Sequence, residues 1–263
     1  MNWLQSIIYG FVSGLTEFIP VSSRAHQRIF LELFGQTTSH PLLDLFVHIA
    51  ILLSLFRYAN NIRNPFTAQR RPSTGLIGYE LRFVKSATIP MLVLFVVFTY
   101  LLRNANSLLM ISVFLLLNGI ILFIPDRIAH GNKDARMMSA FDGVLTGLFG
   151  SLFAFPGISR VAASTSISSL RGASRQHGIN WALSLAIPAL AIVILVDIFH
   201  LFVSFQPMTF VDVIWYIFAA ISAFFGTFVG IRFLQRICSH TGVSVFSYYS
   251  WGAALFAFVL YLL

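Results

Sequence analysis

Charged residues and cysteine are scarce in this sequence. Asp, Glu, Lys and Arg make up 10% of the 263 residues, against about 25% in an ordinary soluble domain. The single cysteine, Cys238, excludes an internal disulfide scaffold. No Walker motif, zinc-ligand spacing, CxxC pair or dinucleotide-binding glycine pattern occurs. These absences exclude the soluble, disordered, collagen-like and disulfide-rich classes of protein.

Long apolar runs take the place of charge. Hydrophobic residues make up 57% of the chain and aromatic residues 15%. Four runs contain no charged side chain: 104–125, 176–196, 213–231 and 237–263. Each is near or above the ~20 apolar residues that cross a bilayer as a helix. The sequence therefore predicts an all-α polytopic membrane protein.

The net charge of +8 is explained by orientation in the membrane. Basic residues gather in the loops 57–85 and 126–138, whereas 205–210 carries no charged side chain. Because cationic loops stay cytoplasmic, we place these two loops inside and the C-terminus outside. No basic-aromatic motif for nucleic acid occurs, so we expect no nucleic-acid partner.

The same charge rule sorts the apolar segments into two kinds. Six segments cross the membrane, and these are 41–56, 86–102, 107–125, 179–204, 209–231 and 245–263. Segments 1–36 and 139–170 must instead enter and return on one side, from opposite faces. We therefore expect a single integral membrane domain over 1–263. It consists of two inverted repeats, about 1–125 and 139–263, each with a re-entrant helical hairpin.

The two hairpins also resemble each other in sequence. Residues 14–24 read GLTEFIPVSSR and residues 150–160 read GSLFAFPGISR, so both match Gly-x5-Pro-x2-Ser-Arg. In each, a proline ends the first arm and a serine-containing stretch starts the second. Helix starts present free N–H groups and a positive dipole end, which attract anions such as phosphate. Inverted repeats with such broken helices place a binding site near the membrane midplane.

The first hairpin tip carries three candidate residue types. Ser22 and Ser23 are either helix caps or, for Ser23, a nucleophile. His26 follows Ser23 by one helical turn and is a candidate proton acceptor or donor. Glu17 is a carboxylate within an apolar segment, which costs ~2.5–3.5 kcal/mol on insertion scales. A base, a ligand of a divalent cation and a partner of an arginine are the roles open to it.

The second tip contributes arginine and serine. Arg160 ends a long uncharged stretch, with Ser159 beside it and Ser164 one turn further on. Its planar guanidinium matches phosphate oxygens, so we expect it to bind phosphate. Arg24 is the equivalent residue in the first tip, where an interfacial charge and a phosphate ligand are equally open. Asp44 and His48 share a helical face within 41–56 and are left unassigned.

These residues resemble the signatures of the undecaprenyl-pyrophosphate phosphatase (bacitracin-resistance) family. GLTEFIPVSSRAH is similar to the family's EGxTEFLPVSSTGH, and PGISRVAAS is similar to PGxSRSGxT. LRGASR…SLAIP at 170–188 resembles the GLSR…SIP continuation, and LLDLFVHIA resembles FDxxLHxG. The resemblance covers most of the chain.

The resemblance implies an activity and a set of roles. Family members hydrolyse undecaprenyl diphosphate to the monophosphate, which regenerates the lipid carrier for peptidoglycan and other cell-wall polymers. By position, Ser23 would be the nucleophile, His26 its acid/base partner and Glu17 the second family glutamate. Ser159, Arg160 and Ser164 would contact the diphosphate together with Ser22 and Arg24. The resemblance also implies a plasma-membrane location, a site facing the periplasm and, as a further partner, a second copy in a homodimer.

Departures from the family pattern affect the cofactor first. Ser13 stands where the family has its first glutamate, so a divalent cation (Mg or Ca) held at Glu17 is in question. Arg24 and Ala25 replace Thr-Gly, and Arg24 brings a positive charge that a metal ion would otherwise supply. The runner-up functions are a polyprenyl-phosphate flippase or transporter and a non-catalytic polyprenyl-phosphate binder. A purely structural role leaves Glu17 and Arg160 unexplained.

Overall fold

The computed structural model describes the whole chain except residues 37, 63–73, 103–106, 129–130, 204–206 and 241. The cations Arg63, Arg70 and Arg71 of the loop 57–85 therefore lie outside the described residues. The described residues form ten α-helices and one 3-10 turn: α1 (Trp3–Phe18), α2 (Ser23–Leu33), α3 (Pro41–Ile62), α4 (Thr74–Leu101), α5 (Leu108–Ile128), α6 (Ala140–Gly150), η1 (Ser151–Ala154), α7 (Arg160–Leu170), α8 (Arg175–Val203), α9 (Phe210–His240) and α10 (Val245–Leu262).

Six helices in the described part of the chain are long and apolar enough to cross a membrane. They are α3, α4, α5, α8, α9 and α10, which confirms the prediction of an all-helical, multi-pass membrane protein. Several begin or end outside the predicted apolar segments; α4, for example, begins at Thr74 rather than near residue 86. Charged residues such as Arg82 and Lys85 do not break a helix, so they mark the edge of the apolar stretch rather than the helix end.

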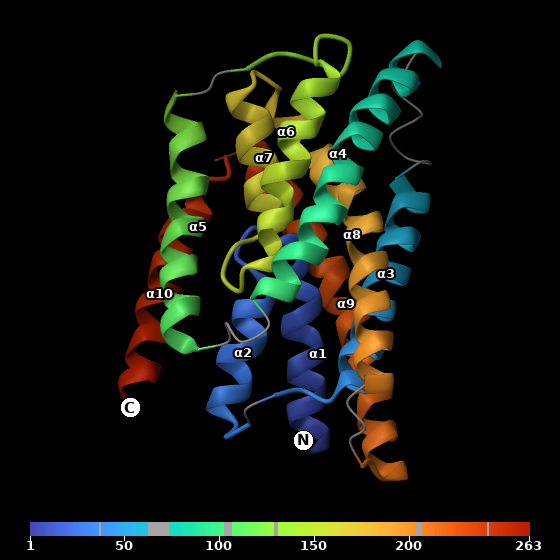
Figure 1. The fold of residues 1–263 in the computed structure, drawn as a ribbon, viewed down its shortest axis with the longest axis vertical. Coiled ribbons are helices and arrows are strands. Elements are labelled where there is room, and N and C mark those ends of the chain that lie inside the picture. The colour runs from blue at the N-terminus through green and yellow to red at the C-terminus, as the bar shows by residue number, and fades with distance from the viewer. Residues whose placement is uncertain (37, 63–73, 103–106, 129–130, 204–206, 241) are drawn as a thin grey trace.

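Two pairs of short helices occupy opposite halves of the molecule (Figure 1). The helices α1 and α2 lie in the lower half, and α6 and α7 lie in the upper half. Each pair is joined by a short connection near the middle, which we call the first tip (residues 19–22) and the second tip (residues 155–159). The long helices α5 and α10 lie on one side of these tips, and α3, α8 and α9 lie on the other.

Glycine pairs let the first helix of each short pair approach a long helix closely. A Cβ at Gly10 or Gly14 of α1 would lie 2.0 or 2.1 Å from a carbonyl oxygen of α9. A Cβ at Gly147 of α6 would lie 2.0 Å from the Ala87 oxygen of α4, and Gly143 is equally close to Ser86. Both pairs have the small-x3-small spacing that brings membrane helices together. Each short pair is thus packed against a long helix from the other half of the chain.

Candidate functional site

Proline and strained backbone shape the first tip. The helix α1 ends at Phe18, two residues before Pro20. Proline has no backbone N–H and so cannot continue the hydrogen-bond ladder of the helix. Ser22 then adopts φ 68° and ψ 100° before α2 starts at Ser23. Positive φ in a residue other than glycine costs roughly 1–3 kcal/mol and persists where its surroundings enforce it. This conformation turns the chain so that α2 begins at Ser23 with its N-terminal end toward the middle of the molecule.

The second tip uses glycine for the same turn. After η1, Pro156 precedes Gly157, whose φ is 128°. Ser159 then caps α7, since its hydroxyl accepts a hydrogen bond from the Ala162 N–H at 3.4 Å. Ser159 therefore serves as a helix cap, and Arg160 is the first residue of α7.

Direct and bridged hydrogen bonds join the two tips. The Gly157 N–H donates to Ser22 Oγ at 3.1 Å. Asn118 of α5 is fully buried and donates from Nδ2 to the Pro20 carbonyl at 2.9 Å. Its Oδ1 accepts from the Ser159 N–H at 2.8 Å. These contacts bring the two tips, and the serine-arginine sequences at the starts of α2 and α7, to one site.

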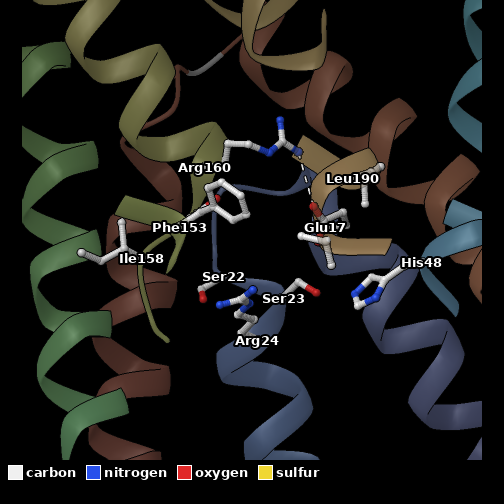
Figure 2. A pocket seen from close by; sticks show the side chains of 11 residues that line it. Glu17, Ser22, Ser23, Arg24, His48, Phe153, Ile158, Arg160 and Leu190 are labelled. Carbon is white, nitrogen blue, oxygen red and sulfur yellow. Dashed lines mark hydrogen bonds and ion pairs between the residues drawn. The ribbon is translucent and has the colours of Figure 1, made fainter. Parts of the chain in front are cut away.

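A small cavity of about 40 Å³ lies where the tips meet. Its polar lining comes from both tips, from the ends of α1, α2 and α7 that adjoin them, and from α3: Glu17, Ser22, Ser23, Arg24, His48, Ser159 and Arg160. Figure 2 shows these side chains, with Phe153, Ile158 and Leu190 as apolar neighbours. The sequence-predicted residues Glu17, Ser22, Ser23, Arg24, Ser159 and Arg160 thus line one cavity.

Two arginines and a glutamate set the charge of this cavity. Arg160 has a side chain 2% exposed; it donates to the Ala182 carbonyl at 2.7 Å and contacts Glu17 at 3.4 Å. Arg24 donates to the Ala154 carbonyl at 3.2 Å, and its guanidinium lies 5.3 Å from the Phe95 ring centroid. The two guanidinium charges outweigh the single carboxylate charge of Glu17.

Two of the predicted site residues lie elsewhere. His26 Nδ1 bonds to the Ser22 carbonyl and its Nε2 to the Tyr249 hydroxyl, both at 2.8 Å. Among the described residues, no hydrogen bond joins His26 to Ser23, and His26 does not line the cavity. Ser164 is buried against Gly150 of α6, where a Cβ would lie 2.8 Å from its Oγ, and it too is outside the cavity lining.

The structure adds residues that sequence reasoning left unassigned. His48 of α3 lines the small cavity, and its Nδ1 lies 2.6 Å from Asp197 Oδ2 of α8. Asp44, which shares its helical face, instead accepts from Tyr9 at 2.7 Å and Ser39 at 2.5 Å. Two features of the sequence could have indicated these residues. His48 shares a helical face with Asp44, and Asn118 is a polar residue within an apolar segment.

A larger cavity of about 400 Å³ adjoins the small one. The two share Arg24, His48 and Val193. The larger cavity continues past Asp44 and Asp197 to the far ends of α4 and α8, at Leu102 and His200. It gives the small cavity a wide, partly polar approach.

The donor set does not fit a divalent cation. Glu17 is paired with Arg160, and the Ser13 hydroxyl is bonded to the Tyr9 carbonyl and to Gln27. Within the described ranges, no three His, Cys, Asp or Glu side chains converge as metal ligands would. Magnesium and calcium take oxygen ligands, carboxylates above all. We therefore derive no chemical step from a protein-held cation.

Fold and site together define a multi-pass helical membrane protein with an arginine- and serine-lined cavity between two helix tips. The family described as Bacitracin resistance protein BacA matches residues 6–256, and the chain belongs to this family. The resemblance noted from the sequence is thereby confirmed.

Relatives from several bacteria match along almost their whole length. Undecaprenyl-diphosphatase from Prochlorococcus marinus (strain MIT 9312) is 28% identical over 274 residues, covering 99% of this chain and 98% of the relative. The enzyme of the same name from Halothermothrix orenii is 27% identical, with 99% and 98% covered. Undecaprenyl-diphosphatase 3 from Bacillus cereus (strain ATCC 10987) is 26% identical, with the same coverage.

Proposed function

We propose that this protein hydrolyses a polyprenyl diphosphate, undecaprenyl diphosphate by family relationship, to the monophosphate and inorganic phosphate. The observation that carries the proposal is the meeting of Ser23, Arg24 and Arg160 at one buried cavity. A hydroxyl beside two fixed guanidinium groups suits nucleophilic attack on a phosphoanhydride, where charge develops on the phosphoryl oxygens. The names of the relatives, undecaprenyl-diphosphatases, support the same substrate.

The reaction divides into two displacements. Ser23 Oγ attacks the terminal phosphorus, a new Oγ–P bond forms, and the bond to the bridging oxygen breaks, so the lipid monophosphate leaves. Water then attacks the phosphoserine, the Oγ–P bond breaks, and inorganic phosphate is released. Arg160 and Arg24 neutralise the phosphoryl charge, and Glu17 keeps Arg160 oriented in the absence of substrate.

We further propose that the two short helix pairs are re-entrant hairpins of inverted repeats, about 1–125 and 139–263. Three observations support this: the pairs occupy opposite halves of the molecule, the tips meet near its middle, and α1 and α6 use the same glycine spacing (Figure 1). The diphosphate then reaches the tips while its polyprenyl chain stays in lipid.

We propose that the site opens to the periplasmic side, with the C-terminus outside. The larger cavity is lined by Thr38, Ser39, Leu102 and His200, at helix ends that the positive-inside rule assigns to the outer face. The two chain termini lie at the same end of the molecule as well (Figure 1). A homodimer stays a prediction.

Phosphate release from purified protein tests the proposal. Wild type in detergent is given undecaprenyl diphosphate and compared with Ser23→Ala, which removes the nucleophile, and Arg160→Lys, which keeps the charge but loses the planar fork. We expect no release from Ser23→Ala and about 100-fold less from Arg160→Lys. Ser184→Ala is a matched control, because this exposed hydroxyl of α8 bonds its own helix.

The runner-up functions give different results in the same assay. A wild-type protein that binds the lipid but releases no phosphate would act as a polyprenyl-phosphate transporter or binder rather than as a phosphatase. Release that survives Ser23→Ala would contradict the assignment of the nucleophile.

A further inference from the structure

We propose that His48 is the proton acceptor for Ser23 and that Asp197 is its positioning residue, which makes Ser23, His48 and Asp197 a catalytic relay. The inference rests on the proposed phosphatase function. Its starting point is that the Ser23 side chain points toward the imidazole of His48 across the small cavity that both residues line (Figure 2).

Asp197 fixes which ring nitrogen of His48 is available. The distance from His48 Nδ1 to Asp197 Oδ2 is 2.6 Å, and a carboxylate oxygen accepts, so Nδ1 carries the proton. In the neutral ring, Nε2 then has a free lone pair. A carboxylate that holds an imidazole in this tautomer also stabilises the imidazolium that forms when it takes a proton.

The His48–Asp197 pair suits proton transfer because it is mostly buried yet keeps some solvent exposure. The side chains of His48 and Asp197 are 14% and 13% exposed. His48 borders both cavities, whereas Asp197 lines the larger one. One side of the ring therefore faces Ser23, and the larger cavity offers a route for water and protons.

The other candidate bases near Ser23 make hydrogen bonds or ion pairs with other groups. His26 Nδ1 bonds to a carbonyl, which only accepts, so Nδ1 carries the proton and Nε2 accepts from the Tyr249 hydroxyl. The carboxylate of Glu17 faces Arg160. Asp44 accepts from two hydroxyls, those of Tyr9 and Ser39.

The relay balances the protons of both displacements. His48 Nε2 takes the Ser23 proton as the Oγ–P bond forms and the bridging P–O bond breaks, and the imidazolium releases that proton to water in the larger cavity. In the second step, neutral His48 takes one proton from the attacking water. It then returns this proton to Ser23 Oγ as the phosphoserine bond breaks.

A rescue experiment separates a catalytic His48 from a structural tie between α3 and α8. Phosphate release from undecaprenyl diphosphate is measured for wild type, His48→Ala, His26→Ala and His177→Ala, each with and without imidazole. General-base loss costs on the order of 100-fold or more, so we expect this loss in His48→Ala with unchanged lipid binding. Added imidazole should restore at least part of it. His177, which bonds Ser174 away from the cavities, is the matched control.

A double-mutant cycle tests the part of Asp197. Asp197→Asn keeps the size of the side chain but presents an amide, which favours the wrong tautomer of His48. If Asp197 acts through His48, the variant carrying both Asp197→Asn and His48→Ala is no slower than His48→Ala alone. Two independent structural losses would instead multiply.

The outcomes distinguish this inference from the proposed function. Wild type that releases no phosphate overturns both. Active wild type with an active His48→Ala, a loss that imidazole leaves unchanged, or multiplying losses in the cycle overturn the relay and leave the phosphatase standing. If His48→Ala fails to fold, Asp197→Asn must still lose at least 10-fold in release while binding lipid; wild-type release from it overturns the relay.

Discussion

Asn118 ties both helix tips to α5, and its replacement tests whether the site depends on that tie. Its side chain makes three hydrogen bonds: to the Pro20 carbonyl, the Ser159 N–H and Ser250 Oγ, at 2.9, 2.8 and 3.0 Å. Asn118→Ala removes all three. The groups left behind are buried between helices and have no access to bulk water.

The size of the effect follows from these bonds. Interhelical hydrogen bonds in membrane proteins average about 0.6 kcal/mol each, which gives about 2 kcal/mol for three. Leaving a buried group unpaired costs roughly 1–3 kcal/mol, so orphaning the Pro20 carbonyl and the Ser159 N–H raises the loss. We expect Asn118→Ala to lower the free energy of unfolding by about 2–4 kcal/mol. Because both tips lose their anchor, kcat for phosphate release should fall at least 10-fold.

Reversible unfolding in mixed micelles measures the stability, and phosphate release measures the activity. Asn180→Ala is the matched control, since this exposed asparagine of α8 bonds Gln176 on its own helix. Asn118→Asp keeps an oxygen for the Ser159 N–H but turns a charged acceptor toward the Pro20 carbonyl, so it should lose at least as much. An Asn118→Ala protein within 0.5 kcal/mol of wild type, with undiminished release, would refute the idea that Asn118 holds the tips together.

Two further predictions concern packing and metal. Gly14→Ala should destabilise the protein by about 1–3 kcal/mol, because the added Cβ would lie 2.1 Å from the Ala223 oxygen. Gly252→Ala is the control in the same unfolding assay. Its Cβ would meet nothing within 4 Å, so this substitution should be neutral or stabilising. Phosphate release should persist in EDTA and fall in Arg24→Ala, because guanidinium groups supply the charge at this site; complete inhibition by EDTA would show that a cation is required after all.

The sequence was sufficient to predict the spanning helices because their cause is local. Long uncharged runs have few ways to satisfy their backbone in lipid other than as helices, and the six candidate spans follow from that. The tip motif was also local: Pro20 follows the end of α1, Pro156 lies within the second tip, and Ser159 caps α7. These features need no knowledge of what packs against them.

The partners of the histidines depend on packing between distant elements. His26 and Ser23 share a helical face, yet the ring of His26 is held by the Ser22 carbonyl one turn back and by Tyr249 of α10. His48 and Asp197 are 149 residues apart, and they meet because α3 packs against α8. Periodicity within one segment carries no information about such a pairing.

Ser13 and Glu17, the two positions where the resemblance implies a family glutamate, have different surroundings. At position 13 the side chain is a neutral hydroxyl, which donates to the Tyr9 carbonyl and accepts from Gln27. At Glu17 a carboxylate meets Arg160, whose side chain is almost fully buried and needs a counter-charge when no substrate is bound. The contact is long, at 3.4 Å, so in the proposed function phosphate oxygens can approach Arg160 while Glu17 stays beside it. In the proposed function, Glu17 keeps Arg160 oriented until the phosphate of the substrate binds.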